Sequence, residues 1–363
     1  MDHKSVNPQK KIKILVSDFR LGRGRIMPDG RLNSFEEFNY GDKFAEFLNY
    51  YSSGAFREYE VELIINGDFL HFLQVDFRGH YLTSITESVA LELLKTIIAG
   101  HEIVFSAMKE FLLNQNKKIT YILGNHDQAM MFQNCRNYLD QFIGVPLQYK
   151  NIAYIIDGIH IEHGHMHESY NRLNPRKLFI RHGYIEPILN LPLGSHLFVH
   201  LVLKIKEKYP YIGKMRPYRL LFKWSLFNKP ILIFDVFKLL LQSLFTIDRT
   251  SSWSLLKIIK TIFSSAWNLN LSQIARKILN EDRIHTVVFS HTHIYDYKKW
   301  GPQKEYFNTG SWTESISLDV TSLGKRTKLT YVMFEYVEGD SNPRGRLKEW
   351  KGFHRIEEDV VVA

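Results

Sequence analysis

Cysteine is almost absent from this sequence, and so are the hydrophobic segments that would export the chain or anchor it in a membrane. A single cysteine among 363 residues, Cys135, excludes an intramolecular disulfide and a zinc site built from a thiolate cluster. Residues 1–11 are polar and contain no secretory signal. The apolar stretches within 196–206 and 231–245 fall short of the ~18 uninterrupted apolar residues of a membrane span. We therefore expect a cytoplasmic protein stabilised by packing or by metal ions with hard ligands.

Acidic residues are scarce in one part of the chain. Between Lys204 and Lys229, eight basic residues face a single acid, Glu207, so this segment carries +7 of the formal net charge of +9. A local excess of positive charge indicates an anionic partner, but it does not separate nucleic acid, anionic lipid and a phosphorylated substrate.

Hydrophobic residues make up 45% of the chain, enough for one large core or for a core with an insertion. Apolar runs at 11–17, 61–66 and 119–123 alternate with helical patterns, and each run ends in a polar loop. A hairpin turn is expected at Asp157-Gly158, and a further strand at 286–289. This order predicts an α/β protein whose polar loops follow buried strands.

Metal-ligand side chains recur in these loops. A lone aspartate after a strand is more often a helix cap or a turn residue, but the ordered series favours a metal site. Carboxylate, amide and imidazole donors suit Mn²⁺, Fe or Zn²⁺. The candidate ligands are Asp18, Asp68, Asn125, His163, His291 and His293.

The motifs Gly124-Asn125-His126-Asp127, His163-Gly164 and Ser290-His291-Thr292-His293 resemble those of the calcineurin-like metallophosphoesterase superfamily, with Ser290 in place of a glycine. The resemblance spans roughly 12–312, except for an insertion at 170–280. It implies two stacked mixed β-sheets flanked by helices, an α/β sandwich. It also implies an enzyme that hydrolyses a phosphate ester or a pyrophosphate by attack of a metal-bridging hydroxide.

The same resemblance assigns roles to single residues. Asp68 would bridge two divalent ions, with Mn²⁺ expected first and Fe or Zn²⁺ as alternatives. Asp18 and His293 would complete one ion, and Asn125, His163 and His291 the other. His126 would be the catalytic general acid near the leaving oxygen.

Two residues depart from the pattern of the superfamily. Arg20 stands where a metal-binding histidine is usual, and a guanidinium has no lone pair for a cation, so occupancy of the Asp18 site is in question. His71 replaces an acid that orients the catalytic histidine in many members. We expect Arg20, Arg23, His71 and His165 to contact substrate. As alternatives, Arg20 pairs with an acid beside a single ion, or His165 supplies a missing ligand.

Residues 170–280 break the alternation of strands and helices and are typical of a helical insertion. We expect a metallophosphoesterase core at 1–169 and 281–340, a lid at 170–280 and a charged tail at 341–363. Narrow polar stripes and basic residues in the lid favour an anionic membrane surface or an acyl chain. A helical subdomain packed on itself is the alternative. The motifs also resemble the branch that contains UDP-2,3-diacylglucosamine hydrolases, which suggests a lipid-linked substrate.

Three functions remain open from the sequence. The first is the phosphoesterase, located in the cytoplasm and peripheral on the inner face of a membrane. The second is a nuclease or nucleotide phosphodiesterase, although the basic segment lacks the spacing of a nucleic-acid module. The third is a catalytically degenerate scaffold associated with a membrane.

Overall fold

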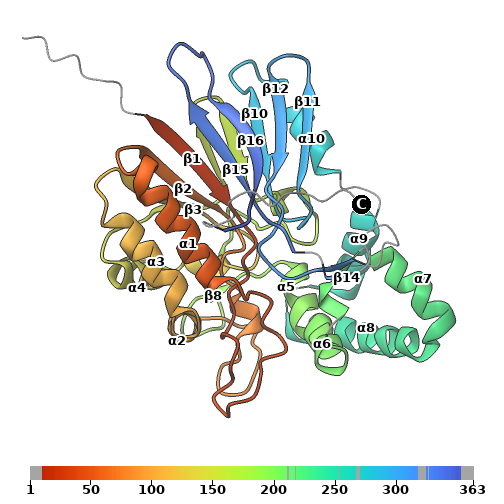
Figure 1. The fold of residues 1–363 in the computed structure, drawn as a ribbon. Coiled ribbons are helices and arrows are strands. Elements are labelled where there is room, and N and C mark those ends of the chain that lie inside the picture. Colours follow the sequence, from red (N-terminus) through yellow and green to blue (C-terminus); the bar gives the residue numbers. More distant parts are fainter. Residues whose placement is uncertain are drawn as a thin grey trace, which may run out of the picture.

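The computed structural model describes residues 10–210, 212–216, 218–251, 253–266, 270–317, 324–325 and 327–352 (Figure 1). Its larger sheet has six strands in the order β16-β15-β1-β2-β3-β4. They are β1 (Lys11–Val16), β2 (Glu60–Asn66), β3 (Lys117–Ile122), β4 (Gln148–Lys150), β15 (Leu329–Tyr336) and β16 (Arg344–Trp350). Strands β1 to β4 are parallel, β15 pairs antiparallel with β1, and β16 pairs antiparallel with β15. The loops after β1, β2 and β3 therefore leave the same edge of the sheet.

The smaller sheet has five strands in the order β11-β12-β10-β6-β5. They are β5 (Ala153–Ile156), β6 (Ile159–Glu162), β10 (Thr286–Phe289), β11 (Asp296–Trp300) and β12 (Lys304–Asn308). Strands β6, β10 and β12 are parallel. The two sheets pack face to face through a buried cluster that includes Leu15, Ile64, Ile161, Val288 and Phe334. The predicted pair of stacked mixed sheets is confirmed.

Helices cover the outer faces of both sheets (Figure 1). Helices α1 (Gly41–Ser52), α2 (Glu87–Gly100), α3 (Glu102–Leu112) and α4 (Gln133–Ile143) lie on the larger sheet, and α10 (Leu271–Ile278) lies on the smaller. Helix α1 buries Phe44, Phe47, Leu48 and Tyr51, which share one face at helical spacing. Helix α2 ends at Gly100, where a Cβ would lie 2.0 Å from the carbonyl oxygen of Arg23, so only glycine fits this position.

The segment 170–280 contributes a second group of helices. These are α5 (Leu193–Leu197), the π-helical turn η5 (Phe198–Val202), α6 (Leu203–Lys208), α7 (Tyr218–Asn228), α8 (Pro230–Thr250) and α9 (Leu255–Ala266). In Figure 1 they lie beyond the carboxyl ends of the strands, on the side of the ligand loops. A buried cluster of Leu193, Ile247 and Ile258 joins α5, α8 and α9.

Short elements complete the described chain. Strands β7 (Phe179–Ile180) and β8 (Ile188–Leu189) form a two-stranded sheet. A three-stranded sheet consists of β9 (Met215–Arg216), β13 (Ile316–Ser317) and β14 (Gly324–Lys325). The remaining short turns are η1 (Gly54–Phe56), η2 (Phe72–Gln74), η3 (Gln128–Met131), η4 (His165–His167) and η6 (Ile212–Lys214). The pairing of β9 with β13 ties the helical segment to the chain that follows the last ligand loop.

One expectation from the sequence needs correction. Part of the expected tail at 341–363 is strand β16, whose charged Arg344, Arg346 and Lys348 are exposed while Trp350 is buried; 353–363 lies outside the described residues. An alternating charged edge strand is easily taken for a tail. By length and composition alone, helix Pro230–Arg249 could cross a membrane. Its apolar sequence is interrupted by Asp235 and Lys238, so it contains no uninterrupted run of ~18 apolar residues.

Candidate metal centre

Two glycines let three ligand loops interlock. A Cβ on Gly67, whose φ is +80°, would lie 2.5 Å from ring atoms of His163. A Cβ on Gly124 would lie 2.3 Å from Oδ1 of Asp68. Real Cβ atoms do not approach so closely, so only glycine allows the loops after β2, β3 and β6 to meet at Asp68.

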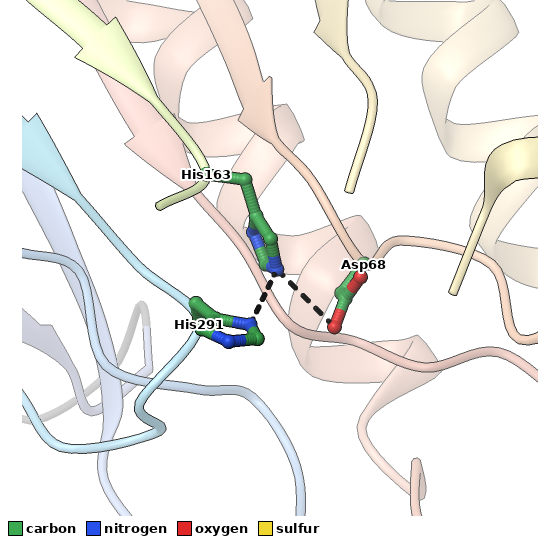
Figure 2. A group of neighbouring side chains, drawn as sticks. All are labelled: Asp68, His163 and His291. Atoms are coloured by element: carbon green, nitrogen blue, oxygen red, sulfur yellow. Dashed lines mark hydrogen bonds and ion pairs between the residues drawn. The ribbon is translucent and has the colours of Figure 1, made fainter. Parts of the chain in front are cut away.

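Asp68, His163 and His291 converge from the ends of β2, β6 and β10 (Figure 2). Nε2 of His163 lies 3.3 Å from Oδ2 of Asp68 and 3.2 Å from Nδ1 of His291. One ligand atom from each side chain lies within 4.8 Å of the others, and all three residues are buried. One carboxylate oxygen and two imidazole nitrogens are thus gathered as a cation would require.

Hydrogen bonds to the opposite nitrogens orient both imidazoles. Nδ1 of His163 lies 2.9 Å from the carbonyl oxygen of Asn66, to which it can donate. Nε2 of His291 lies 2.8 Å from Oε2 of Glu168. With protons on these nitrogens, Nε2 of His163 and Nδ1 of His291 keep lone pairs for a metal. Glu168 was missed from the sequence, because a glutamate in an irregular loop carries no signal.

A second, sparser group forms around Asp18. Its Oδ2 accepts hydrogen bonds from Oγ of Ser17 at 2.6 Å and from the backbone N–H of His291 at 3.2 Å. Its Oδ1 lies 3.6 Å from Nε2 of His293. Fewer donors therefore surround Asp18 than Asp68, and the assignment of these residues to two ions stays a prediction.

Orphaned oxygen atoms test whether these residues fit a cation. Oδ1 of Asp18 and Oδ1 of Asn125 are buried and accept no hydrogen bond from the described residues. A buried oxygen without a donor is costly, and a metal ion would satisfy it. Burial would lower the pKa of His163, but the charges of Asp68 and Asp18 raise it to about 9, so positive charge is favoured at this position. The orphaned oxygens and the negative charge around His163 therefore fit a divalent ion.

The Asn125 loop is held against Asp68 by its neighbours. The N–H of His126 donates to Oδ1 of Asp68 at 2.9 Å. The carboxylate of Asp127 accepts from the N–H of Gly124 and, at 2.8 Å, from the hydroxyl of Tyr121. Burial and the charge of Asp68 raise the pKa of Asp127 to about 7. Asp127 thus closes the loop from behind and positions Asn125 and His126.

Backbone strain is concentrated at this site. Seven non-glycine residues in the described chain have a positive φ. Five of them are candidate site residues, namely Asp18 (φ 54°), Arg20 (55°), Asp68 (50°), His291 (72°) and His293 (60°). Each such conformation costs of order 1–3 kcal/mol, and strain of this kind clusters at functional sites. The strained backbone therefore marks residues that the sequence analysis had named as candidates for the site.

Arg20 lies inside the candidate centre. Its Nη2 is 3.5 Å from Oδ2 of Asp68 and 3.1 Å from Nε2 of His126, and its Nη1 is 3.9 Å from Oε2 of Glu37. Burial would raise the pKa of Glu37, but Lys206 and Arg20 lower it to about 2. Nζ of Lys206, which is buried on α6, lies 2.8 Å from Oε1 of Glu37. A guanidinium therefore stands beside the carboxylate expected to bridge two metals.

His71 and His126 form a neutral stack. Their ring centroids are 4.1 Å apart, and Phe198 of η5 lies 4.6 Å from His71 and 5.5 Å from His126. Burial, with the charges of Arg20 and Lys206, lowers the pKa of His71 to about 3. Burial and the same Arg20 also hold the pKa of His126 well below its ordinary value. The helical segment contributes Phe198 as a wall of the site.

The other expected substrate contacts divide. Arg23 binds Asp76, with Nε donating to Oδ1 at 2.9 Å and Nη2 donating to its carbonyl oxygen at 3.0 Å. Its guanidinium is therefore directed to another loop. His165 is buried, with its ring centroid 5.4 Å from that of His163. Of these two residues, the structure brings only His165 to the ligand group.

No protein-family model and no curated protein matches the chain. Among solved structures, Vps29 from Chaetomium thermophilum aligns over 93% of this chain and 94% of its own, at 8% identity and a TM-score of 0.30. The calcineurin-like phosphoesterase YfkN from Bacillus subtilis aligns over 94% and 91%, at 10% identity and 0.35. A dimetal phosphatase from Danio rerio aligns over 93% and 98%, at 9% identity and 0.31. Values this low leave the chemistry of the chain to be argued from its own residues.

Proposed function

We propose that the chain is a metal-dependent phosphoesterase with the calcineurin-like arrangement of ligands. The convergence of Asp68, His163 and His291 at 4.8 Å or less carries the proposal. The orphaned oxygens of Asp18 and Asn125 support it. A divalent ion bound there would supply a Lewis acid and an acidified water for attack on phosphorus.

The two ion positions are unequal. Asp68, Asn125, His163 and His291 would hold one ion. Asp18 and His293, with Asp68 shared, would hold a second, which the guanidinium of Arg20 opposes through its charge. Mn²⁺ is the first expectation for the better site, and Fe or Zn²⁺ also suits its oxygen and imidazole donors.

Arg20 and His126 supply the groups that would meet a phosphate. The planar fork of Arg20 can bind two phosphate oxygens. In the described state Arg20 donates to Nε2 of His126, which places the imidazole proton on Nδ1. Transfer of Arg20 from His126 to the substrate would release Nε2, so that His126 can protonate and serve as the general acid at the leaving oxygen.

The substrate that we propose is a phosphate ester or a pyrophosphate joined to a lipid. Phe198 supports an apolar group next to the reacting phosphate, because its ring lies against both His71 and His126. Lys206, on the same helical segment, pairs with Glu37 and so connects α6 to the surroundings of Arg20. We propose that α5, η5 and α6 form a lid over the site.

The test combines hydrolysis and metal content. The purified chain should cleave bis-p-nitrophenyl phosphate when Mn²⁺ is added, and Asp68→Ala should remove both the activity and most of the bound metal. His126→Ala should reduce the rate but keep the metal. Asp157→Ala, at the hairpin turn between β5 and β6, is the matched control and should change neither. Equal rates in Asp68→Ala and the wild type would sink the proposal.

One observation favours a second function, a non-catalytic scaffold. Arg20 already neutralises Asp68 at 3.5 Å, as a site that has lost its metals would require. A chain that retains no ion under saturating Mn²⁺ would place scaffolding first.

The nuclease alternative is tested with a panel of substrates that contains single-stranded nucleic acid and lipid pyrophosphates. Cleavage of the nucleic acid in preference to the lipid pyrophosphates would favour the nuclease.

A further inference from the structure

Helix α8 carries an apolar face that the protein leaves uncovered. Ile231, Phe234, Phe237, Leu241 and Phe245 recur at intervals of three and four residues, and each is between 41% and 68% exposed. Residues at this spacing share one side of a helix. We propose that this face docks the protein on the surface of an anionic lipid bilayer.

The opposite face of α8 is fixed to the protein. Ile247 is fully buried against α5 and α9. Oγ of Ser243 donates to the carbonyl oxygen of His200 at 2.7 Å, and Asp235 accepts from the hydroxyl of Tyr209 at 2.9 Å. These bonds hold α8 on η5 and α6. The helix therefore lies along a membrane interface, with one side in protein and one side in lipid, and does not cross the bilayer.

Helices next to α8 also carry exposed apolar side chains. Trp224 is 50% exposed and Phe227 88% exposed on α7, and Leu256 is 83% exposed on α9. Both helices contact α8. Aromatic side chains favour the interface between water and lipid, so Trp224 and Phe227 suit a bilayer surface.

Charge selects the kind of partner. Exposed basic side chains lie on or between α7, α8 and α9, and they are Lys223, Lys229, Lys238, Arg249, Lys257 and Lys260. The acids between 218 and 260 are Asp235 and Asp248. Asp235 is paired with Lys208, and Asp248 accepts from the N–H of Leu255 at 2.8 Å. An apolar face with a basic rim matches acyl chains beneath anionic headgroups, whereas a second copy of the same face would bring like charges together.

Docking would place the candidate centre close to the membrane. The segment that carries α8 also supplies Phe198 and Lys206 to the surroundings of Arg20 and His126. A lipid-linked substrate could then reach the site without leaving the bilayer surface. The docking proposal does not rest on the proposed hydrolysis, because an inactive chain would bind the same vesicles.

Vesicle co-sedimentation of the full chain tests the proposal. Sucrose-loaded vesicles of phosphatidylcholine are compared with vesicles that also contain phosphatidylglycerol. We expect binding to the anionic vesicles, and weaker binding as salt is raised. The double variant Phe234→Asp/Phe237→Asp should bind at least about a hundred-fold more weakly, because each buried phenylalanine contributes strongly to insertion.

Matched variants separate docking from folding. Ile103→Asp, on α3 at a site 51% exposed, introduces the same charge away from the face and should leave vesicle binding unchanged. Lys229→Glu/Lys238→Glu should weaken binding to anionic vesicles by about ten-fold or more. Metal content should be equal in all variants. Failure of the wild type to bind anionic vesicles, unchanged binding by the phenylalanine variant, or wild-type dimers that this variant dissociates would overturn the proposal.

Discussion

Replacing Arg20 with histidine should convert the centre from one bound ion to two. Nη2 of Arg20 lies 3.5 Å from Oδ2 of Asp68. At an effective dielectric constant of about 20, a unit charge at that distance interacts with the carboxylate by about 5 kcal/mol. A second cation at Asp68 must compete with this charge. Recovery of about half of it, ~2.7 kcal/mol, would tighten the second ion by about a hundred-fold.

The substitution also supplies an imidazole where the guanidinium offers no lone pair. Histidine tolerates the backbone at this position, where φ is +55°, better than most residues do. We expect equilibrium dialysis against Mn²⁺, followed by elemental analysis, to find about one ion per wild-type chain and about two per Arg20→His chain. Arg23→His is the matched control, since Arg23 lies in the same loop but binds Asp76.

Two results would refute this reasoning. A wild-type chain that binds two ions with similar affinity would mean that Arg20 does not oppose the second ion. A folded Arg20→His chain that stays at one ion would mean that the Asp18 group cannot hold a cation. Circular dichroism establishes folding in both cases.

Three further predictions concern the surroundings of the centre. Lys206→Met should lower the free energy of unfolding by about 3 kcal/mol in urea, because it leaves buried Glu37 without its nearest cation, while exposed Lys204→Met should change it little. Burial disfavours the charged form of Glu37, but Lys206 and Arg20 lower its folded pKa from 4.5 to about 2, so this carboxyl adds stability above pH 4.5 that is lost as the pH falls towards 2. The ionised Glu37 carboxylate adds about 3 kcal/mol to the free energy of unfolding at neutral pH. Glu37→Gln should reduce the loss of stability between pH 4.5 and pH 2. An unchanged dependence of stability on pH would contradict a lowered pKa for Glu37. Glu168→Gln should weaken Mn²⁺ binding by about ten-fold to a hundred-fold in calorimetric titration, with exposed Glu186→Gln as the control, and equal affinities would exclude an orienting role for Glu168.

The sequence predicted the ligand group because each ligand is a local feature. Asp68, for example, directly follows a buried strand and a glycine, and parallel strands bring such ends to one edge without any knowledge of tertiary contacts. The two stacked sheets were expected only through the resemblance of the motifs to a known superfamily. The expectation of unequal ion sites came from Arg20, which is visible in the motif itself, and it stays a prediction.

Contacts between distant segments were not predictable in this way. Glu168 reaches His291 across 123 positions, and Lys206 reaches Glu37 across 169. Neither residue belongs to a periodic pattern or a turn motif, so its partner is set only by how the segments pack. Phe198 was hidden for the same reason, within an apolar stretch whose buried side depends on the core that it meets.

The buried pair between Lys206 and Glu37 connects the helical segment to the candidate metal centre through charge. Glu37 divides its charge between Lys206 and Arg20, so a movement of α6 that removes Lys206 leaves Glu37 a stronger competitor for the guanidinium. Arg20 would then be drawn away from Asp68, and the affinity of the centre for a cation would rise. Because coupling between two binding events is reciprocal, any ligand that shifts α6 must change metal affinity by the same factor by which metal changes the affinity for that ligand.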